Sequence, residues 1–164
     1  MKHLKLFFAC LLTAVLSIGQ VWADPVTVSK TVHDLYPNDA NGTQECTLYS
    51  TSPLTISVNC DGNNGKIYGT GTEWRLYQTN SAVVTVELSE GELSSVSFTF
   101  SVSNTAKLSY GSTALTSGTA VNVSGSSATF SVGNTGNATN GQVKISGFSV
   151  TYTPAGGGAP QPAG

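Results

Sequence analysis

Apolar and hydroxyl residues alternate along most of this chain, which is the pattern of β-strands that bury one face and expose the other. Residues 95–102 alternate without a break, residues 54–58 repeat the pattern, and the more fully apolar residues 82–88 indicate a central strand. No segment after Ala23 keeps a helical period. Further strands are predicted at residues 26–32, 66–68, 73–78, 107–110, 121–123 and 129–132.

The last predicted strand changes phase partway along its length. Val143 and Ile145 occupy odd positions, whereas Phe148 and Val150 occupy even ones, and Gly147 lies between the two pairs. A β-bulge at this glycine would add one residue and return the apolar side chains to one face. We therefore expect a single strand with a bulge at Gly147.

About ten short strands, separated by turns rich in Gly, Asn and Ser, indicate an all-β fold. We predict a two-sheet antiparallel sandwich of jelly-roll-like topology. An immunoglobulin-like sandwich is the main alternative. Cys46 and Cys60 lie too close in sequence for the bridge that joins the two sheets of that fold.

The first 23 residues have the pattern of a signal peptide. A basic start is followed by an apolar run over residues 6–18 and by Val21-Trp22-Ala23, which suits cleavage after Ala23. The run is too short to span a bilayer, although a retained membrane anchor is the alternative. We therefore expect a secreted, cell-surface or periplasmic protein. Its signal peptide would span residues 1–23, its sandwich domain residues 24–154, and a flexible Gly/Pro/Ala tail or linker stub residues 155–164.

Two cysteines remain once Cys10 leaves with the signal peptide. Cys46 and Cys60 both occupy even positions on predicted strands, so we expect them on one face of a hairpin that turns at residues 50–53. An even number of cysteines in an oxidising compartment favours a disulfide. The alternative is a pair of free, buried thiols.

The net charge of the chain excludes some classes of binding partner. Nine acidic and five basic residues follow Ala23, which gives a net charge of −4. Nucleic acids and anionic lipids both select basic surfaces, so neither is expected as a partner, and no membrane insertion is expected after signal cleavage. Ser, Thr, Asn and Gly supply most of the polarity, which fits an exported surface module better than a cytosolic enzyme.

Catalytic groups are scarce, and no enzymatic activity is expected. His33 is the one histidine of the mature chain, and no Gly-x-Ser-x-Gly sequence is present. Glu73, Glu87, Glu90 and Glu92 are the candidates for the paired carboxylates of a glycoside hydrolase. The last two flank a glycine and indicate an exposed hairpin turn, and Glu87 alternates outward, so we interpret them as solvated surface residues.

Two segments were compared with calcium loops. Residues 61–65 begin like an EF-hand, but Gly65 stands where a side-chain oxygen is required and Thr72 stands where the bidentate glutamate belongs. Residues 39–43 fail in the same way. A calcium site built from backbone carbonyl groups would leave no such pattern, and we expect neither a metal nor a cofactor.

The strand that begins at Glu73 carries the candidate binding residues. Alternation places Trp74 in the core, whereas Glu73, Arg75 and Tyr77 face outward. A ring, a guanidinium and a carboxylate suit a sugar, because its C–H faces stack on rings and its hydroxyl groups take bidentate hydrogen bonds. Tyr68 joins them as a candidate ligand-binding residue. The alternative is a stabilising cross-strand ladder without a ligand.

Several segments together resemble a β-sandwich module of exported and surface proteins from gut-dwelling Gram-negative anaerobes. The likeness spans residues 26–153 and is carried by residues 73–78 (EWRLYQ), 95–100 (SVSFTF), 130–136 (FSVGNTG) and 140–145 (NGQVKI). The signal segments LFFA (6–9) and IGQVWA (18–23) resemble those of the same proteins. Such modules are mostly uncharacterised, and the resemblance implies glycan binding or the spacing of other domains, with no catalytic residues. The Cys46–Cys60 pair is not part of it.

We therefore predict a non-catalytic secreted module that binds a glycan. A structural or adhesive surface module with no small-ligand site is the alternative. An enzyme ranks third, because the chain offers few acids and bases.

Overall fold

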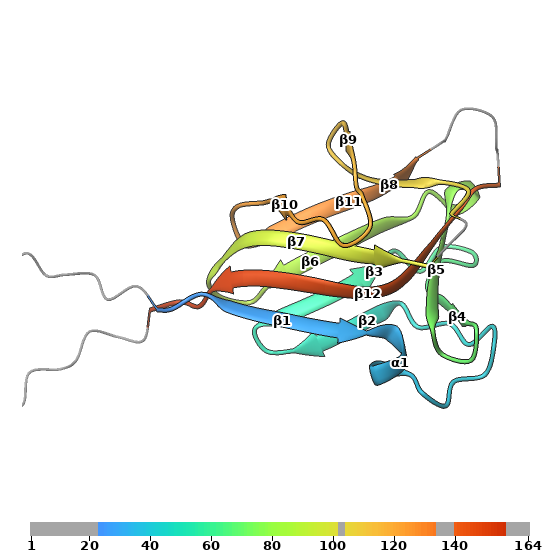
Figure 1. The fold of residues 1–164 in the computed structure, drawn as a ribbon, viewed down its shortest axis with the longest axis horizontal. Helices are drawn as coiled ribbons and strands as arrows, with labels where there is room; N and C mark the ends of the chain where they lie inside the picture. Colours follow the sequence, from blue (N-terminus) through green and yellow to red (C-terminus); the bar gives the residue numbers. More distant parts are fainter. Residues whose placement is uncertain (1–22, 102–103, 134–139, 157–164) are drawn as a thin grey trace, which may run out of the picture.

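The computed structural model describes residues 23–101, 104–133 and 140–156. Apart from Ala23, the predicted signal peptide lies outside these residues, as do residues 157–164 of the predicted tail. The described residues form two antiparallel sheets of six strands each, which face each other as a sandwich (Figure 1). The predicted all-β sandwich is confirmed.

We name the sheets A and B. Sheet A has the order β10 (Val121–Asn122), β7 (Glu92–Phe100), β12 (Gln142–Thr153), β5 (Glu73–Tyr77) and β4 (Lys66–Tyr68), and β1 (Val26–Thr31) also pairs with β12. Sheet B has the order β2 (Thr47–Thr51), β3 (Leu54–Val58), β6 (Val83–Leu88), β11 (Ser127–Gly133), β8 (Lys107–Tyr110) and β9 (Thr113–Ala114).

The strands from β5 to β12 have jelly-roll order. Sheet A contains the series β5, β12, β7 and β10, and sheet B contains the series β6, β11, β8 and β9. Every connection from β5 to β8 crosses between the sheets, and the last strand returns to lie between β5 and β7. Strands β1 to β4 extend both sheets on the same side of this jelly roll.

Alternate side chains of the two sheets fill the core. Trp74, Phe98 and Phe130 are fully buried, and the rings of Phe98 on β7 and Phe130 on β11 meet edge to face with centroids 5.3 Å apart. Burying an aromatic or aliphatic side chain of this size stabilises the fold by about 1.5–3 kcal/mol. Because these rings come from opposite sheets, their contact holds the sandwich closed.

The hairpin predicted around Glu90 and Glu92 is wrong. Strand β6 belongs to sheet B and β7 to sheet A, so the segment is a corner between sheets. Gly91 has φ +96°, and a Cβ there would lie 2.5 Å from the carbonyl oxygen of Thr153, at the end of β12. Alternation shows that two strands follow each other, but it does not show which partners they choose.

The strand predicted at residues 26–32 ends at Thr31, because a short helix, α1 (Val32–Leu35), follows. The backbone N–H of Asp34 donates to the Thr31 hydroxyl (3.1 Å), and the N–H of Thr31 donates to the Asp34 carboxylate (3.0 Å). These hydrogen bonds form a capping box. The Thr31 hydroxyl and then the Thr31 backbone N–H stabilise the Asp34 carboxylate and lower its pKa. Within the described ranges, no helix is long and apolar enough to cross a membrane.

The predicted bulge at Gly147 is confirmed. The pairing of β12 with β7 shifts between Ile145 and Gly147, and Val143, Ile145, Phe148 and Val150 are all buried. Past the bulge, β12 pairs with β1, whereas before it β12 pairs with β5. The bulge therefore lies where one neighbour of β12 replaces the other.

The predicted hairpin and disulfide are also present. Strands β2 and β3 are joined at Ser52 and Pro53, and Cys46 and Cys60 form a disulfide with their Cα atoms 5.4 Å apart. The cysteines lie just outside the two strands, where the backbone N–H of Val58 still donates to the carbonyl of Cys46 (2.8 Å). The bond closes the open end of the hairpin.

We expect Gly147→Ala to lower the free energy of unfolding by about 2 kcal/mol. The added Cβ would lie 3.0 Å from the carbonyl oxygen of Lys30, on the backbone of β1. Gly133→Ala is the control, because a Cβ there has nothing within 4 Å among the described residues. Urea unfolding measures both variants, and equal stability of the two would contradict the assigned packing at the bulge.

We expect the Cys46→Ser/Cys60→Ser variant to lose about 3 kcal/mol of stability, because the disulfide closes a loop of about 15 residues. Unfolding curves recorded with and without dithiothreitol test this. The reductant should bring the wild-type protein to the stability of the variant and leave the variant unchanged. A wild-type curve insensitive to the reductant would show that the bond does not stabilise the fold.

Candidate functional site

The candidate residues lie on the outer face of sheet A. Trp74 on β5 is fully buried, whereas Glu73, Arg75 and Tyr77 are partly exposed on the opposite side of the strand. Tyr68 on β4 lies directly opposite Glu73. The alternation predicted for this strand is confirmed, and the four candidate residues share one surface.

Glu73 and Tyr68 hold Arg75 in place, and Ser101 in turn holds Glu73. Its Nε and Nη2 atoms donate to Oε2 of Glu73 at 2.9 and 2.8 Å, and the hydroxyl of Ser101 donates to Oε1 of Glu73 at 3.0 Å. The guanidinium carbon lies 4.0 Å from the centre of the Tyr68 ring, in a cation–π contact. We call Tyr68, Glu73, Arg75 and Tyr77 the Arg75 cluster.

Tyr77 extends this cluster along β5. Burial is the main cause that raises the pKa of its phenol, Tyr68 raises it further, and the positive charge of Arg75 partly opposes both effects. The phenol therefore stays protonated at neutral pH and can both donate and accept a hydrogen bond. Its backbone N–H donates to the side-chain oxygen of Asn64 (3.0 Å).

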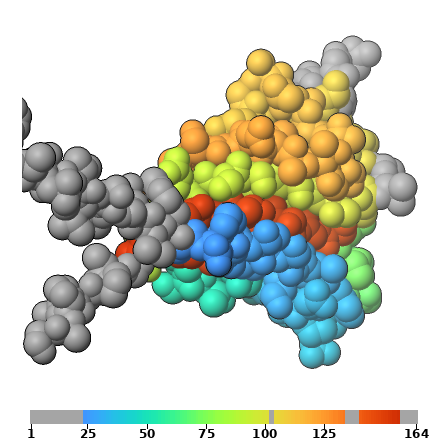
Figure 2. Space-filling model, turned by 60° about the vertical axis from the view of Figure 1, so that its left-hand side comes forward, coloured from blue at the N-terminus to red at the C-terminus, as the bar shows by residue number. Residues whose placement is uncertain are grey.

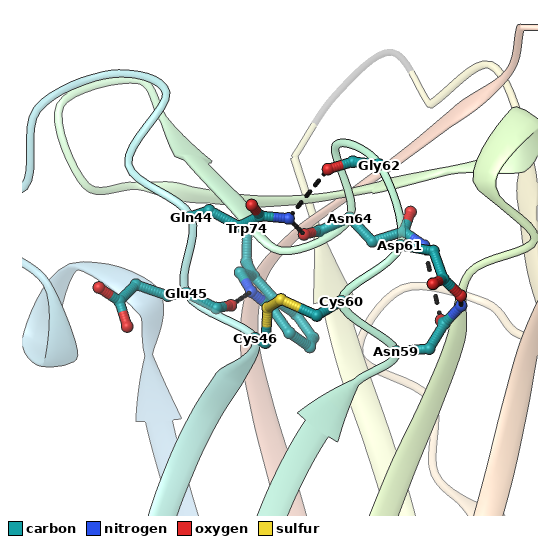
Figure 3. Close-up of a disulfide and its surroundings, with 9 residues drawn as sticks. All are labelled: Gln44, Glu45, Cys46, Asn59, Cys60, Asp61, Gly62, Asn64 and Trp74. Carbon is teal, nitrogen blue, oxygen red and sulfur yellow. Dashed lines mark hydrogen bonds between the residues drawn. A yellow bond between two sulfur atoms is a disulfide. The ribbon is translucent and has the colours of Figure 1, made fainter.

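Asn64 fixes the loop after Cys60 against β5, a role that the sequence analysis missed. It is fully buried; its amide nitrogen donates to the carbonyl of Asn80 (3.0 Å), and Gln44 donates to the carbonyl of Asn64 (2.8 Å). Figure 3 shows Gln44 reaching this loop beside the disulfide. Asn64 and Gly65 form an Asn-Gly pair, a turn signal that marks this loop in the sequence.

Trp74, on the core side of β5, bonds to the segment that precedes the disulfide. Its indole N–H donates to the carbonyl of Glu45 (2.7 Å), the residue before Cys46 (Figure 3). The disulfide-bonded hairpin therefore supports the strand that carries the Arg75 cluster.

The loop compared with a calcium site shows no cluster of metal ligands. The carboxylate of Asp61 accepts a hydrogen bond from the Asn59 side chain (2.6 Å). Within the described ranges, no group of three His, Cys, Asp or Glu side chains could hold a metal ion.

A groove of about 690 Å³ lies on the same outer face, over β1, β12 and β7. Figure 2 shows these strands side by side, in blue, red and yellow-green. The groove lies between α1 and the segment at Gly118. Seven of its thirteen described lining residues carry a hydroxyl group: Ser29, Thr31, Thr72, Ser97, Thr99, Ser146 and Ser149. None of the four predicted site residues belongs to the described lining.

Strand register explains why the groove was missed. Ser149 lies opposite Ser29 on β1 and opposite Ser97 on β7, and the Ser29 hydroxyl donates to that of Ser149 (2.8 Å). Alternation placed these serines outward, but it did not show that three distant segments pair. His33, the one histidine after Ala23, lies exposed on α1 at the edge of the groove.

Tyr36 fixes the wall that α1 contributes to the groove. Its phenol donates to the carbonyl groups of Thr47 (2.6 Å) and Leu48 (3.2 Å) on β2. Burial raises the pKa of Tyr36 to about 12, with smaller contributions from the charges of Glu45 and Asp39. The helix is therefore held between the two sheets.

Among the carboxylates considered for glycoside hydrolysis, Glu73, Glu87 and the Glu90/Glu92 pair lie on three different parts of the surface. Glu87 is exposed on the outer face of sheet B, whereas Glu73 lies on the outer face of sheet A. Glu90 and Glu92 lie at the corner next to Thr153, at the far end of β12. A glycosidase would place its two carboxyl groups within about 10 Å of each other across one cleft.

The chain matches no protein-family model, no curated protein and no solved structure. The resemblance noted from its sequence segments therefore stays a prediction. The function has to be argued from the geometry of the outer face of sheet A.

Replacing Glu73 tests how firmly Arg75 is held. We expect Glu73→Gln to destabilise the fold by about 1 kcal/mol, because Arg75 loses a charge-assisted hydrogen bond. The side chains of Arg75 and Glu73 are only 23% and 17% exposed, so this pair is less screened than a typical surface pair. A double-mutant cycle with Arg75→Met isolates the coupling, and the exposed Glu87→Gln is the control. A coupling energy near zero would contradict this account.

Proposed function

We propose that this protein is a non-catalytic carbohydrate-binding module that uses the outer face of sheet A. The observation that carries the proposal is the Arg75 guanidinium, fixed over the Tyr68 ring by Glu73 on a partly exposed surface. Aromatic rings and planar guanidinium groups are suited to the C–H faces and the hydroxyl pairs of a pyranose.

The rigidity of the Arg75 cluster supports a binding role. Ordering a long side chain on binding costs about 0.5–1.5 kcal/mol, and Arg75 is already ordered by Glu73 and, through it, by Ser101. The hydrogen bond from the Tyr77 backbone to Asn64 fixes the end of the same strand. The binding surface would therefore be preorganised, and a ligand would not have to order Arg75 when it binds.

The groove extends the polar surface available to a glycan. Thr72, part of its lining, directly precedes Glu73 of the cluster. Hydroxyl side chains donate and accept without adding charge, which suits the hydroxyl groups of a saccharide. A chain of several sugar units has more of this face to contact than a single ring has.

Export of the protein is part of the proposal. The Cys46–Cys60 disulfide supports it, because structural disulfides persist in oxidising compartments. The basic and apolar pattern of residues 1–23 supports it from the sequence.

A structural or adhesive surface module is the second candidate function. The observation in its favour is that outer hydroxyl groups bond to one another, as in the pairs Thr27–Thr151 (2.9 Å) and Ser29–Ser149 (2.8 Å). Such cross-strand pairs stabilise a sheet without any ligand. None of the four residues of the Arg75 cluster is among the described lining residues of the groove, which also fits a structural module.

A glycan array, followed by affinity electrophoresis, tests the proposal with two double variants. We expect Arg75→Ala/Tyr77→Ala to weaken binding by at least about tenfold, the loss typical of binding residues worth more than about 1 kcal/mol. Ser97→Ala/Ser149→Ala tests the contribution of the groove separately, and circular dichroism checks folding.

Loss of binding only in the serine variant would move the site to the groove. Binding unchanged in both variants would remove this face of sheet A as the site. No binding by the folded wild-type protein to any saccharide on the array would favour the structural module.

A further inference from the structure

Three basic side chains form one row across sheet A. Lys66 on β4 lies directly opposite Arg75 on β5, and Arg75 lies directly opposite Lys144 on β12. Their sequence neighbours Ile67, Trp74 and Ile145 are fully buried, so all three cations face outward. We call Lys66, Arg75 and Lys144 the cationic row.

The row is short and dense. Neighbouring strands lie about 4.8 Å apart, so the three positions span about 10 Å. Tyr68 and Tyr77 flank it on the same face, two residues beyond Lys66 and Arg75 respectively. The row therefore passes through the middle of the Arg75 cluster.

Such a row opposes folding, because like charges on directly opposite residues destabilise a sheet. Within the described residues, Glu73 is the one carboxylate that forms an ion pair with the row, and it pairs with Arg75. Lys66 and Lys144 have no carboxylate within 4.0 Å in the described part of the chain. Three of the five basic residues after Ala23 thus gather on a protein with a net charge of −4.

Three of the nine acidic residues that follow Ala23 lie far from the row. Glu87 faces outward from sheet B, and Glu90 and Glu92 lie at the corner beside Thr153. Thr153 is roughly 30 Å along β12 from Lys144, well beyond the Debye length of about 8 Å at physiological salt. These three carboxylates therefore do not cancel the positive field at the row.

We propose that the cationic row makes the glycan site selective for acidic saccharides, in which a carboxylate or a sulfate group is carried on the sugar ring. This inference rests on the proposed carbohydrate function. The cations pair with the anionic groups, while Tyr68 and Tyr77 contact the sugar rings on either side. A row of three cations is too small for the many phosphate contacts that hold duplex nucleic acid.

Paired polysaccharides test the charge requirement with the purified protein. Polygalacturonate is compared with its fully methyl-esterified form, and dextran sulfate with dextran, by affinity electrophoresis and calorimetry. Uronate-bearing, sulfated and neutral saccharides on an array widen the search, and a DNA duplex serves as a polyanion without sugar acids. We expect at least one acidic form to bind about tenfold or more tightly than its neutral partner, and less tightly at high salt.

Two lysine variants locate the effect. We expect Lys144→Ala to weaken binding to the acidic form several-fold and Lys66→Ala/Lys144→Ala to weaken it further, with no loss of thermal stability. Lys107→Ala on the outer face of sheet B is the matched control for the change in net charge. It should leave binding unchanged.

The outcomes separate this inference from the carbohydrate proposal. Equal binding of acidic and neutral forms would keep the carbohydrate function and overturn the acidic selectivity. No binding to any saccharide would overturn both. Equally tight binding of the DNA duplex, or an equal loss in Lys107→Ala, would overturn the saccharide site and leave only a general attraction for polyanions.

Discussion

The position of β12 is the constraint on which the rest of the structure depends. This strand pairs with β7 along most of its length, while on its other side β5 and then β1 take the remaining hydrogen bonds. The bulge at Gly147 allows both, because it absorbs one residue where β5 gives way to β1. Without that shift, the apolar residues of one half of β12 would face the solvent. The groove contains Ser146 and Gly147, so it lies at the same junction.

Much of the fold could be predicted from alternation, because burial on one face imposes a period of two on each strand. Alternation predicted the strand at residues 54–58 and the phase change at Gly147. It also placed Cys46 and Cys60 on one face, where they form a disulfide. The corner at Glu90 was not predicted, because local pattern does not choose between partners in two sheets. Helix α1 was missed for a different reason: its capping box, Thr31 with Asp34, is a local signal that was overlooked at the end of an apparent strand.

The candidate site, like the fold, could be predicted only in part from the sequence. The outward direction of Glu73, Arg75 and Tyr77 follows from the burial of Trp74 between them. Which residues become neighbours across strands depends on register, and register is set by the whole sheet. Lys144 is far in sequence from Lys66 and Arg75, and Ser29, Ser97 and Ser149 are far from one another. No local signal marks either set as a unit, although every member occupies an outward position.

The two ends of the sandwich differ in what they carry. Strand β1 begins opposite the end of β12, at the register pair Val26–Tyr152, so the chain enters and leaves the sandwich at one end (Figure 1). The Arg75 cluster lies toward the opposite end, beside the start of β12. Anything joined to either terminus would leave from the same pole of the domain. The polar surface of β4 and β5 would then point away from that attachment, toward the surroundings.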